Sequence, residues 1–283
     1  MKRRPVRRML PDFVRAVVLL FFFLLVALPI YWMFITSIKT NQEIINTQAV
    51  TYFPRTITLE NYKQLFSLLN YGTFLKNSVK LSVATAVVVT VLSIFGGYGL
   101  ARFRFRGKGA MLVFILITQM IPSILVIIPL YNTFSRAGLL AACPHLALFI
   151  YYVIANIPFC CITMRSFFER IPYSLEEAAM VDGCSRMKCI LRIVLPIMFP
   201  GIVAVFTFAF IGAWNELIAG IMFTSQPSQL TIPVGLKGLI GKNNVQWGAM
   251  MAGGMLALLP TAVMFIFVQR YIVDGLTAGA VKE

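Results

Sequence analysis

The feature that most constrains this chain is a series of long stretches that hold almost no charged side chains. Five of these stretches are uncharged, and the sixth contains a single acid, Glu216; they are residues 16–38, 81–101, 109–135, 137–164, 247–268 and, with Glu216, 199–223. An α-helix needs about 20 apolar residues to cross the hydrocarbon layer of a bilayer. We therefore expect six transmembrane helices in place of one water-soluble core.

The composition supports this reading. Apolar residues make up 59% of the chain and charged residues 12%, with a mean hydropathy of +0.83, whereas soluble domains carry about 25% charged residues. Backbone groups inside lipid must bond to one another, which favours helices. The predicted class is an all-α, polytopic membrane protein. A secretory signal peptide at the basic amino terminus is the alternative for the first stretch, but the stretch is too long and no A-x-A site follows it.

The basic residues predict the orientation of the helices. The net charge is +15, and most Lys and Arg fall near the amino terminus, at 102–108, at 165–192 and near the carboxyl end. Basic residues concentrate in cytoplasmic segments, so we expect both termini in the cytoplasm and no nucleic-acid partner. The cluster at 102–108 is typical of such anchoring to the membrane; a patch for anionic lipid or nucleotide is the alternative.

These observations divide the chain into three parts. We expect a basic cytoplasmic amino terminus at 1–14, a six-helix membrane domain at 15–271, and a cytoplasmic tail at 272–283. Within the domain, external loops are expected at 39–72 and 224–246, the first with a short helix from about Leu59 to Leu69. Pro122 lies inside the third span and should kink or break it.

The segment 172–198 is the longest charged, amphipathic interruption of the apolar pattern. Ser174 and Glu177 have the spacing of a capping box, in which each side chain bonds the other residue's backbone N–H. Asp182-Gly183 is a turn signal that should end a short helix, and a second short helix should follow and close at Pro196. The prediction is a compact knob; a surface helix pair of no special purpose is the alternative.

This knob resembles the cytoplasmic coupling loop of the permease subunits of ABC-type importers. The family pattern is E-A-A, two residues, D-G-A, and an apolar residue followed by proline about nine residues later. In this chain Cys184 stands where the family has alanine. The matching positions are Glu177, Ala178, Ala179, Asp182, Gly183 and Leu195-Pro196.

The resemblance implies that the knob docks into a cleft on a separate ATP-binding subunit. ATP and magnesium would then be bound by that partner, and this chain would bind no cofactor. The tail, from Gln269 to Glu283, resembles the tail of maltose-type carbohydrate permeases. Its implied contacts with the ATPase pair are Gly275, Gly279 and Lys282, and a frayed terminus is the alternative.

A carboxylate, that of Glu216, interrupts the fifth predicted span. A carboxylate at membrane depth is unfavourable unless it faces a cavity or a partner, which makes Glu216 a candidate for the translocation path. Trp214 and Asn215 precede it, and an aromatic face beside amide and carboxylate groups suits a sugar. The alternative is an interfacial tryptophan with a glutamate that reaches the outer surface or pairs with another subunit.

The sequence contains no pattern for catalysis. It has no Walker A loop and no nucleophile elbow, and its five cysteines show no C-x-x-C spacing. His145 is the only histidine, so a histidine-based metal site is excluded. We expect no catalytic residue, no metal site and no enzymatic activity in this chain.

The combined prediction is a permease subunit of an ATP-driven, binding-protein-dependent carbohydrate importer in a bacterial inner membrane. The resemblance implies four kinds of partner: a second homologous permease, a dimer of ATP-binding subunits, an extracytoplasmic sugar-binding protein and membrane lipid. An importer of another solute, such as glycerol phosphate or a polyamine, is the first alternative. A stand-alone carrier or channel is the second.

Overall fold

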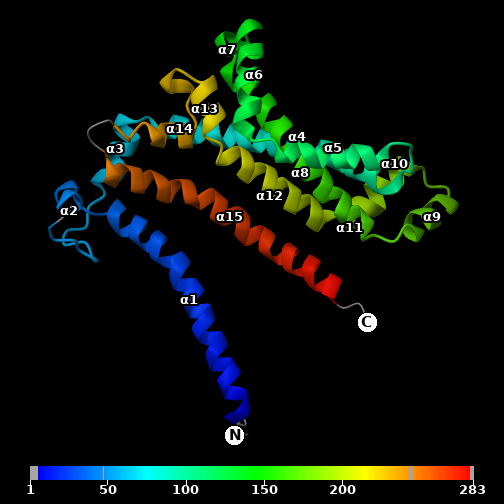
Figure 1. The fold of residues 1–283 in the computed structure, drawn as a ribbon, viewed down its shortest axis with the longest axis horizontal. Coiled ribbons are helices and arrows are strands. Elements are labelled where there is room, and N and C mark those ends of the chain that lie inside the picture. The colour runs from blue at the N-terminus through cyan, green and yellow to red at the C-terminus, as the bar shows by residue number, and fades with distance from the viewer. Residues whose placement is uncertain (1–5, 47, 242–244, 281–283) are drawn as a thin grey trace. The chain divides into compact units, whose positions relative to one another are not determined.

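The computed structural model describes residues 6–46, 48–241 and 245–280 (Figure 1). The chain forms two compact units. The first joins the residues up to Tyr71 to the segment Leu236–Leu258, and the second holds Gly72–Gly235 and the residues from Leu259 onward.

The first unit is built on two long helices. They are α1 (Val6–Ser37) and the first turns of α15 (Trp247–Ala280), accompanied by the short helices α2 (Asn41–Ile45) and α3 (Glu60–Leu68). The apolar part of α1, Phe13–Ser37, has the length and composition of a membrane span, and none of its most apolar window is buried. Such a surface is unstable against water, so lipid or another protein must cover it.

The predicted short helix in the first loop is confirmed as α3. Its Asn61 is buried and donates from Nδ2 to the carbonyls of Ser37, at 2.9 Å, and Lys39, at 2.8 Å. Further on, the Tyr71 hydroxyl donates to the Gly253 carbonyl of α15 at 3.1 Å. These bonds fix the loop to the ends of both long helices.

The second unit contains most of the remaining helices. In chain order, the elements between the two long segments of the first unit are α4 (Tyr71–Arg102), α5 (Lys108–Met120), α6 (Ser123–Arg136), α7 (Leu139–Ala142), α8 (Pro144–Glu169), α9 (Ser174–Val181), α10 (Arg186–Cys189), a π-helical turn (Ile190–Val194), α11 (Leu195–Ile197), α12 (Phe199–Trp214), α13 (Ile218–Phe223), a 3₁₀ turn (Pro227–Gln229) and α14 (Ile232–Lys237).

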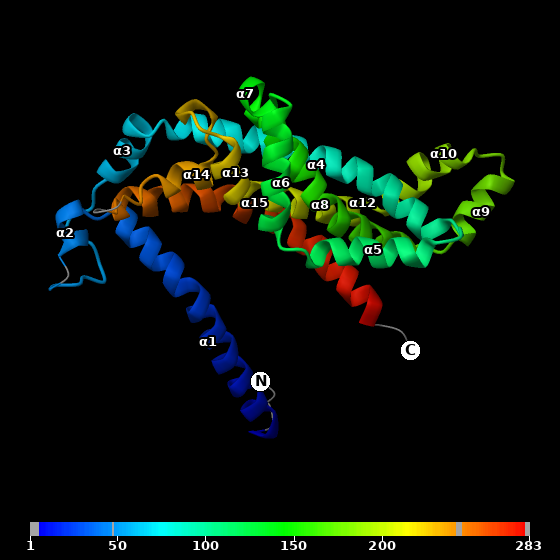
Figure 2. The same cartoon turned by 45° about the horizontal axis from the view of Figure 1, so that its top comes forward.

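Helix α8 is the centre of this unit, and it packs against α5, α6, α12 and α13 (Figure 2). The buried core gathers apolar side chains from α4, α6, α8, α12 and α13, among them Leu81, Ile127, Tyr152 and Phe223. Glycine allows the closest contact between helices: a Cβ at Gly97 of α4 would lie 2.9 Å from the backbone nitrogen of Arg165 in α8. Small residues at helix contacts are typical of membrane proteins.

Helices occupy all six predicted stretches, although not each as one continuous span. Four helices are long and apolar enough to cross a membrane, and two bent helix pairs raise the number to as many as six in the described residues. The predicted break in the third span is confirmed, because α5 and α6 meet at 91° around Pro122. The sixth helix is longer than expected and continues through the predicted tail to Ala280.

The prediction of one continuous fifth helix is wrong. The structure breaks the helix at residues 215–217, between α12 and α13. The Glu216 carboxylate accepts hydrogen bonds from the backbone N–H groups of Ala219, at 2.9 Å, and Gly220, at 3.1 Å. These N–H groups belong to the first turn of α13, so the side chain that interrupts the apolar pattern also caps a new helix.

Candidate coupling site

The segment 172–198 forms the predicted pair of short helices, but its first helix begins differently from the prediction. The capping box of Ser174 and Glu177 is wrong: the N-cap of α9 is Tyr173, and no side chain bonds the helix end. The Leu175 N–H already donates to the Pro172 carbonyl at 3.3 Å. The chain therefore turns helically from Pro172, and the Ser174 hydroxyl lies one position too late to cap.

The end of α9 is a Schellman motif, which confirms the turn predicted at Asp182-Gly183. Gly183 has a φ of +82°. Its N–H donates to the Met180 carbonyl at 3.1 Å, and the Cys184 N–H donates to the Ala179 carbonyl at 3.0 Å. Glycine adopts this left-handed conformation without steric strain, so Gly183 sets the angle at which the chain leaves α9.

Glu176 anchors the segment to α4, a contact that the sequence did not predict. Its side chain is 2% exposed. Arg102 donates from Nε to one carboxylate oxygen at 2.6 Å, and the Tyr98 hydroxyl donates to the other at 2.7 Å. A second guanidinium nitrogen of Arg102 donates to the Ile171 carbonyl at 2.9 Å. Breaking such a buried ion pair strongly destabilises a protein, because one charge is left unpaired.

Residues at the end of α4 make two further contacts with the segment. The Arg102 guanidinium lies 5.6 Å from the ring centre of Tyr173, just before α9. The Arg186 guanidinium of α10 lies 5.1 Å from the ring centre of Phe103. Both contacts have the distance of a cation–π interaction. The segment is thus held to the end of α4 by ionic, hydrogen-bond and aromatic contacts.

The opposite side of the segment is open. Glu177, Ala178, Asp182 and Gly183 are exposed, while Ala179 is buried. Exposed apolar side chains accompany them, above all Val181, which is 86% exposed. Apolar groups that are exposed on a rigid knob are typical of a surface that another protein covers.

Pro196 has a structural consequence at the end of the segment. It lies in α11, directly after the π-helical turn Ile190–Val194, and the helix then bends by 79° between Ile197 and Phe199. Proline has no N–H for the bond to the preceding turn, which favours a widened turn and a bend. Helix α11 ends at Ile197, one residue past Pro196, where the second short helix was predicted to close.

The three candidates for the translocation path, Trp214, Asn215 and Glu216, do not form one exposed surface. Trp214 is 2% exposed and stacks on Phe210, with ring centres 5.5 Å apart. Asn215 is exposed at the helix break, and Glu216 is partly buried as it caps α13. The break therefore presents the Asn215 amide and the partly buried Glu216 carboxylate, whereas the Trp214 ring is buried against Phe210.

The carboxyl end contributes a helical face. Gly275 and Gly279 lie in the last turns of α15, and residues four apart share one side of a helix. Lys282 lies outside the described residues. Among the residues with described positions, no group of three or more His, Cys, Asp or Glu side chains could hold a metal ion.

An all-helical chain with helices long and apolar enough to span a membrane, and with an exposed pair of short helices between the fourth and fifth predicted spans, defines a class, the polytopic membrane proteins. The family described as the binding-protein-dependent transport system inner membrane component matches residues 90–277. The chain belongs to this family and is a permease subunit of an ABC transporter.

Individual relatives match nearly all of the chain. The diacetylchitobiose uptake system permease protein DasC of Streptomyces coelicolor is 36% identical over 282 residues and covers 100% of both chains. The trehalose/maltose transport system permease protein MalG of Thermococcus litoralis is 31% identical over 259 residues, which are 90% of this chain and 91% of MalG.

A solved structure confirms the fold. It is the crystal structure of a bacterial ABC transporter involved in the import of the acidic polysaccharide alginate. One of its chains superposes with a TM-score of 0.78 at 21% identity, covering 96% of this chain and 99% of that chain. The predicted all-α, polytopic class is therefore correct.

Proposed function

We propose that this chain is the membrane-spanning permease subunit of an ATP-driven carbohydrate importer that depends on an extracytoplasmic binding protein. Relatives that match 90–100% of the chain carry the names of diacetylchitobiose and trehalose/maltose systems. The chain would lie in a bacterial inner membrane with both termini in the cytoplasm, and its segment 172–198 would then face the cytoplasm.

The observation that carries the proposal is the anchored knob. Its inner side is fixed to α4 through Glu176 and Arg102, and its outer side exposes Glu177, Asp182 and Val181. A rigid element that is bound on one side and open on the other can transmit the movement of a partner. Closure of an ATP-bound dimer would displace the knob, and α4 would follow as part of a rigid-body transition between inward-open and outward-open states.

The remaining partners follow from the surfaces of the chain. The apolar window of α1, which is unburied, is available to membrane lipid and to a second homologous permease. Two such permeases would enclose the path, to which this chain would contribute Asn215 and Glu216. The helix break beside them resembles the discontinuous helices that line substrate sites in other transporters. ATP and magnesium would be held by the partner ATPase, and Gly275, Gly279 and Lys282 of the tail would contact it.

Two alternative functions share features with the proposed carbohydrate importer. An importer of glycerol phosphate or of a polyamine would keep the assembly and change the solute. A stand-alone carrier or channel would need no ATPase. The relatives are named after saccharide systems, which favours carbohydrate import over import of another solute. The exposed knob favours a mechanism driven by a partner ATPase over a stand-alone carrier.

Co-purification separates an ATP-driven importer from a stand-alone carrier or channel. The tagged chain is co-expressed with the candidate ATPase and isolated in detergent, alongside a Val181→Asp variant of the exposed face. We expect the ATPase to co-purify with the unmodified chain and to be lost from the variant, because a carboxylate would be buried in an apolar contact. Lys237→Ala, far from the knob in sequence, should retain the ATPase. Absence of any ATPase from the unmodified chain would overturn the proposal.

A further inference from the structure

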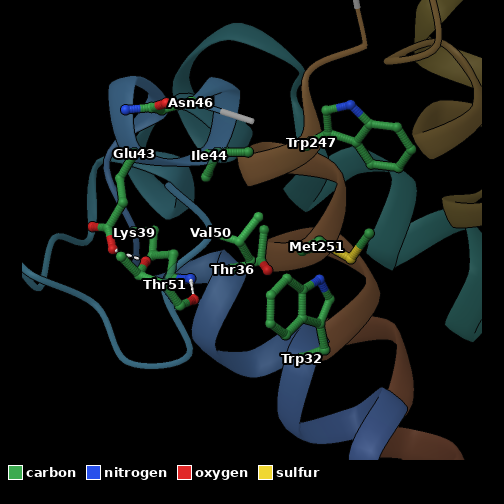
Figure 3. A pocket seen from close by; sticks show the side chains of 10 residues that line it. All are labelled: Trp32, Thr36, Lys39, Glu43, Ile44, Asn46, Val50, Thr51, Trp247 and Met251. Atoms are coloured by element: carbon green, nitrogen blue, oxygen red, sulfur yellow. Dashed lines mark hydrogen bonds between the residues drawn. The ribbon is translucent and has the colours of Figure 1, made fainter. Parts of the chain in front are cut away.

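The first unit contains a pocket that the coupling mechanism does not use (Figure 3). Its volume is about 460 Å³, and it is walled by the end of α1, the segment from Lys39 to Thr51 and the start of α15. Sites for small molecules are typically about 300–1,000 Å³. Two of the chain's three tryptophans, Trp32 and Trp247, line it.

The loop wall of this pocket is held in place by its own hydrogen bonds. The Lys39 ammonium donates to the Thr51 carbonyl, and the Thr51 hydroxyl donates to the Glu43 carboxylate (Figure 3). The Arg55 N–H also donates to Glu43, at 3.2 Å. The buried amide of Asn61 ties the start of the loop to the end of α1. The pocket is thus formed before any ligand arrives, which lowers the entropic loss on binding.

The two tryptophans offer apolar ring surface to this space. Trp32 is 40% exposed and Trp247 is 47% exposed, in contrast to the 2% of Trp214. Tryptophans also occur at membrane interfaces as anchors, but these two come from different helices and line one cavity. Glu43 and Asn46 on the loop wall add polar groups, of which the Glu43 carboxylate already accepts from Thr51 and Arg55 and the Asn46 side-chain oxygen accepts from the Gln48 N–H. The Asn46 amide also has N–H donors. Apolar ring faces beside such groups suit a sugar, whose C–H face stacks while its hydroxyls bond.

The charges in the pocket select against an anionic ligand. Lys39 is the basic residue among the described lining residues, and it is only 4% exposed. Its ammonium is bonded to Thr51 and lies 5.0 Å from the ring centre of Trp32. Glu43 adds a negative charge to the same wall. The Glu43 carboxylate would therefore repel a phosphate headgroup, and the Lys39 ammonium is already bonded to Thr51. A neutral polyol carries no charge and would not be repelled.

We propose that this pocket binds a neutral saccharide unit at the outer end of α1 and α15, apart from the helix break at Glu216. The inference rests on the proposed function for its orientation, since the loop 39–72 faces the binding protein only if both termini are cytoplasmic. The pocket would hold one sugar ring of the cargo before it enters the path between the permeases.

Calorimetric titration tests the pocket directly. The full-length chain in lipid nanodiscs is titrated with diacetylchitobiose, trehalose and, as an anionic headgroup probe, glycerol 3-phosphate. We expect one of the disaccharides to bind and glycerol 3-phosphate not to bind. Trp247→Leu and Trp32→Leu should each weaken saccharide binding by about tenfold or more, because each removes a stacking face.

Two controls keep the result interpretable. Phe53→Leu changes an exposed aromatic residue of the same loop that does not line the pocket, and it should bind like the unmodified chain. Trp247→Phe keeps an aromatic ring and should restore most of the affinity, which a misfolded variant would not. No saccharide binding, binding unchanged by both leucine variants, or binding of glycerol 3-phosphate would each overturn the inference. ATP-dependent sugar uptake by the whole transporter would still proceed in those cases, so failure of the pocket is distinct from failure of the proposed function.

Discussion

Arg102 and Glu176 form an ion pair at 2.6 Å that joins the end of α4 to the first turn of α9. Their side chains are 9% and 2% exposed, and Tyr98 completes the carboxylate's bonds. The orientation of the knob is therefore set by contacts within the chain, before any partner binds. Under the proposed function, a displacement of the knob would move α4 with it.

The first prediction separates the two adjacent glutamates. Glu176→Gln should lower the stability of the second unit by about 3 kcal/mol, because Arg102 is left as a buried, unpaired charge. Thermal unfolding in detergent measures this change. Glu177→Gln is the matched control, since Glu177 is exposed; it should unfold like the unmodified chain and instead weaken retention of the ATPase. Equal melting temperatures for the two variants would contradict the anchoring role.

The second prediction concerns Gly183. A Cβ at this position would meet no atom within 4 Å, so a substitution acts through the backbone φ of +82° alone. Gly183→Val should cost about 1–2 kcal/mol locally and turn the knob away from its docking angle. We expect normal membrane insertion with ATP hydrolysis that no longer drives uptake. Gly183→Asn, which tolerates the left-handed region better, should remain partly coupled, and fully coupled transport by the valine variant would refute the role.

The third prediction distinguishes two roles of Glu216. Glu216→Gln keeps an acceptor for the N–H groups of α13 but removes the charge, whereas Glu216→Ala removes both. If the Glu216 carboxylate lines the translocation path, the glutamine variant should assemble normally and transport saccharide with an altered rate or substrate preference. The alanine variant should also lose about 1 kcal/mol of stability through the lost cap. Uptake and preference that are unchanged in Glu216→Gln would make the path prediction wrong.

The fourth prediction is a pH dependence of the loop wall. The hydrogen bond from the Thr51 hydroxyl, followed by bonds and charges from Arg55 and Lys39, holds the pKa of Glu43 below its ordinary value of 4.5. A lowered carboxyl pKa stabilises the folded loop fully above 4.5, and this stabilisation is lost as the pH falls through the lowered value. Amide hydrogen exchange across residues 43–55 should become faster, relative to the intrinsic rate, in that acidic range. Thr51→Val should remove most of this pH dependence, and an unchanged dependence in the variant would contradict the assignment.

The number, order and approximate bounds of the spans could be predicted from the sequence because the requirement is local. A helix in lipid must be long and apolar, and each of the six stretches meets that requirement by itself. The turn at Gly183 was predictable for a similar reason, since Asp-Gly is a local signal.

The features that were mispredicted or missed depend on partners distant in sequence. Glu176 and Glu177 look alike in the sequence, and only the contact with Arg102, on another helix, decides which one is buried. A one-residue shift at Tyr173 was enough to remove the predicted capping box. The break in the fifth helix was signalled by Glu216, but hydropathy alone does not tell a carboxylate that faces a cavity from one that caps a helix. The pocket at Trp32 and Trp247 joins residues from opposite ends of the chain and has no local signature.

The most direct test of the central claim is ATP-dependent uptake in membrane vesicles. The chain is co-expressed with its candidate second permease and ATPase, and labelled mono-, di- and oligosaccharides are supplied with the matching binding proteins. The account predicts uptake of one saccharide, lost when either the ATPase or the binding protein is omitted. An assembled complex that hydrolyses ATP but accumulates no saccharide would contradict the carbohydrate assignment, and saccharide uptake that persists without the ATPase would contradict the ATP-driven mechanism itself.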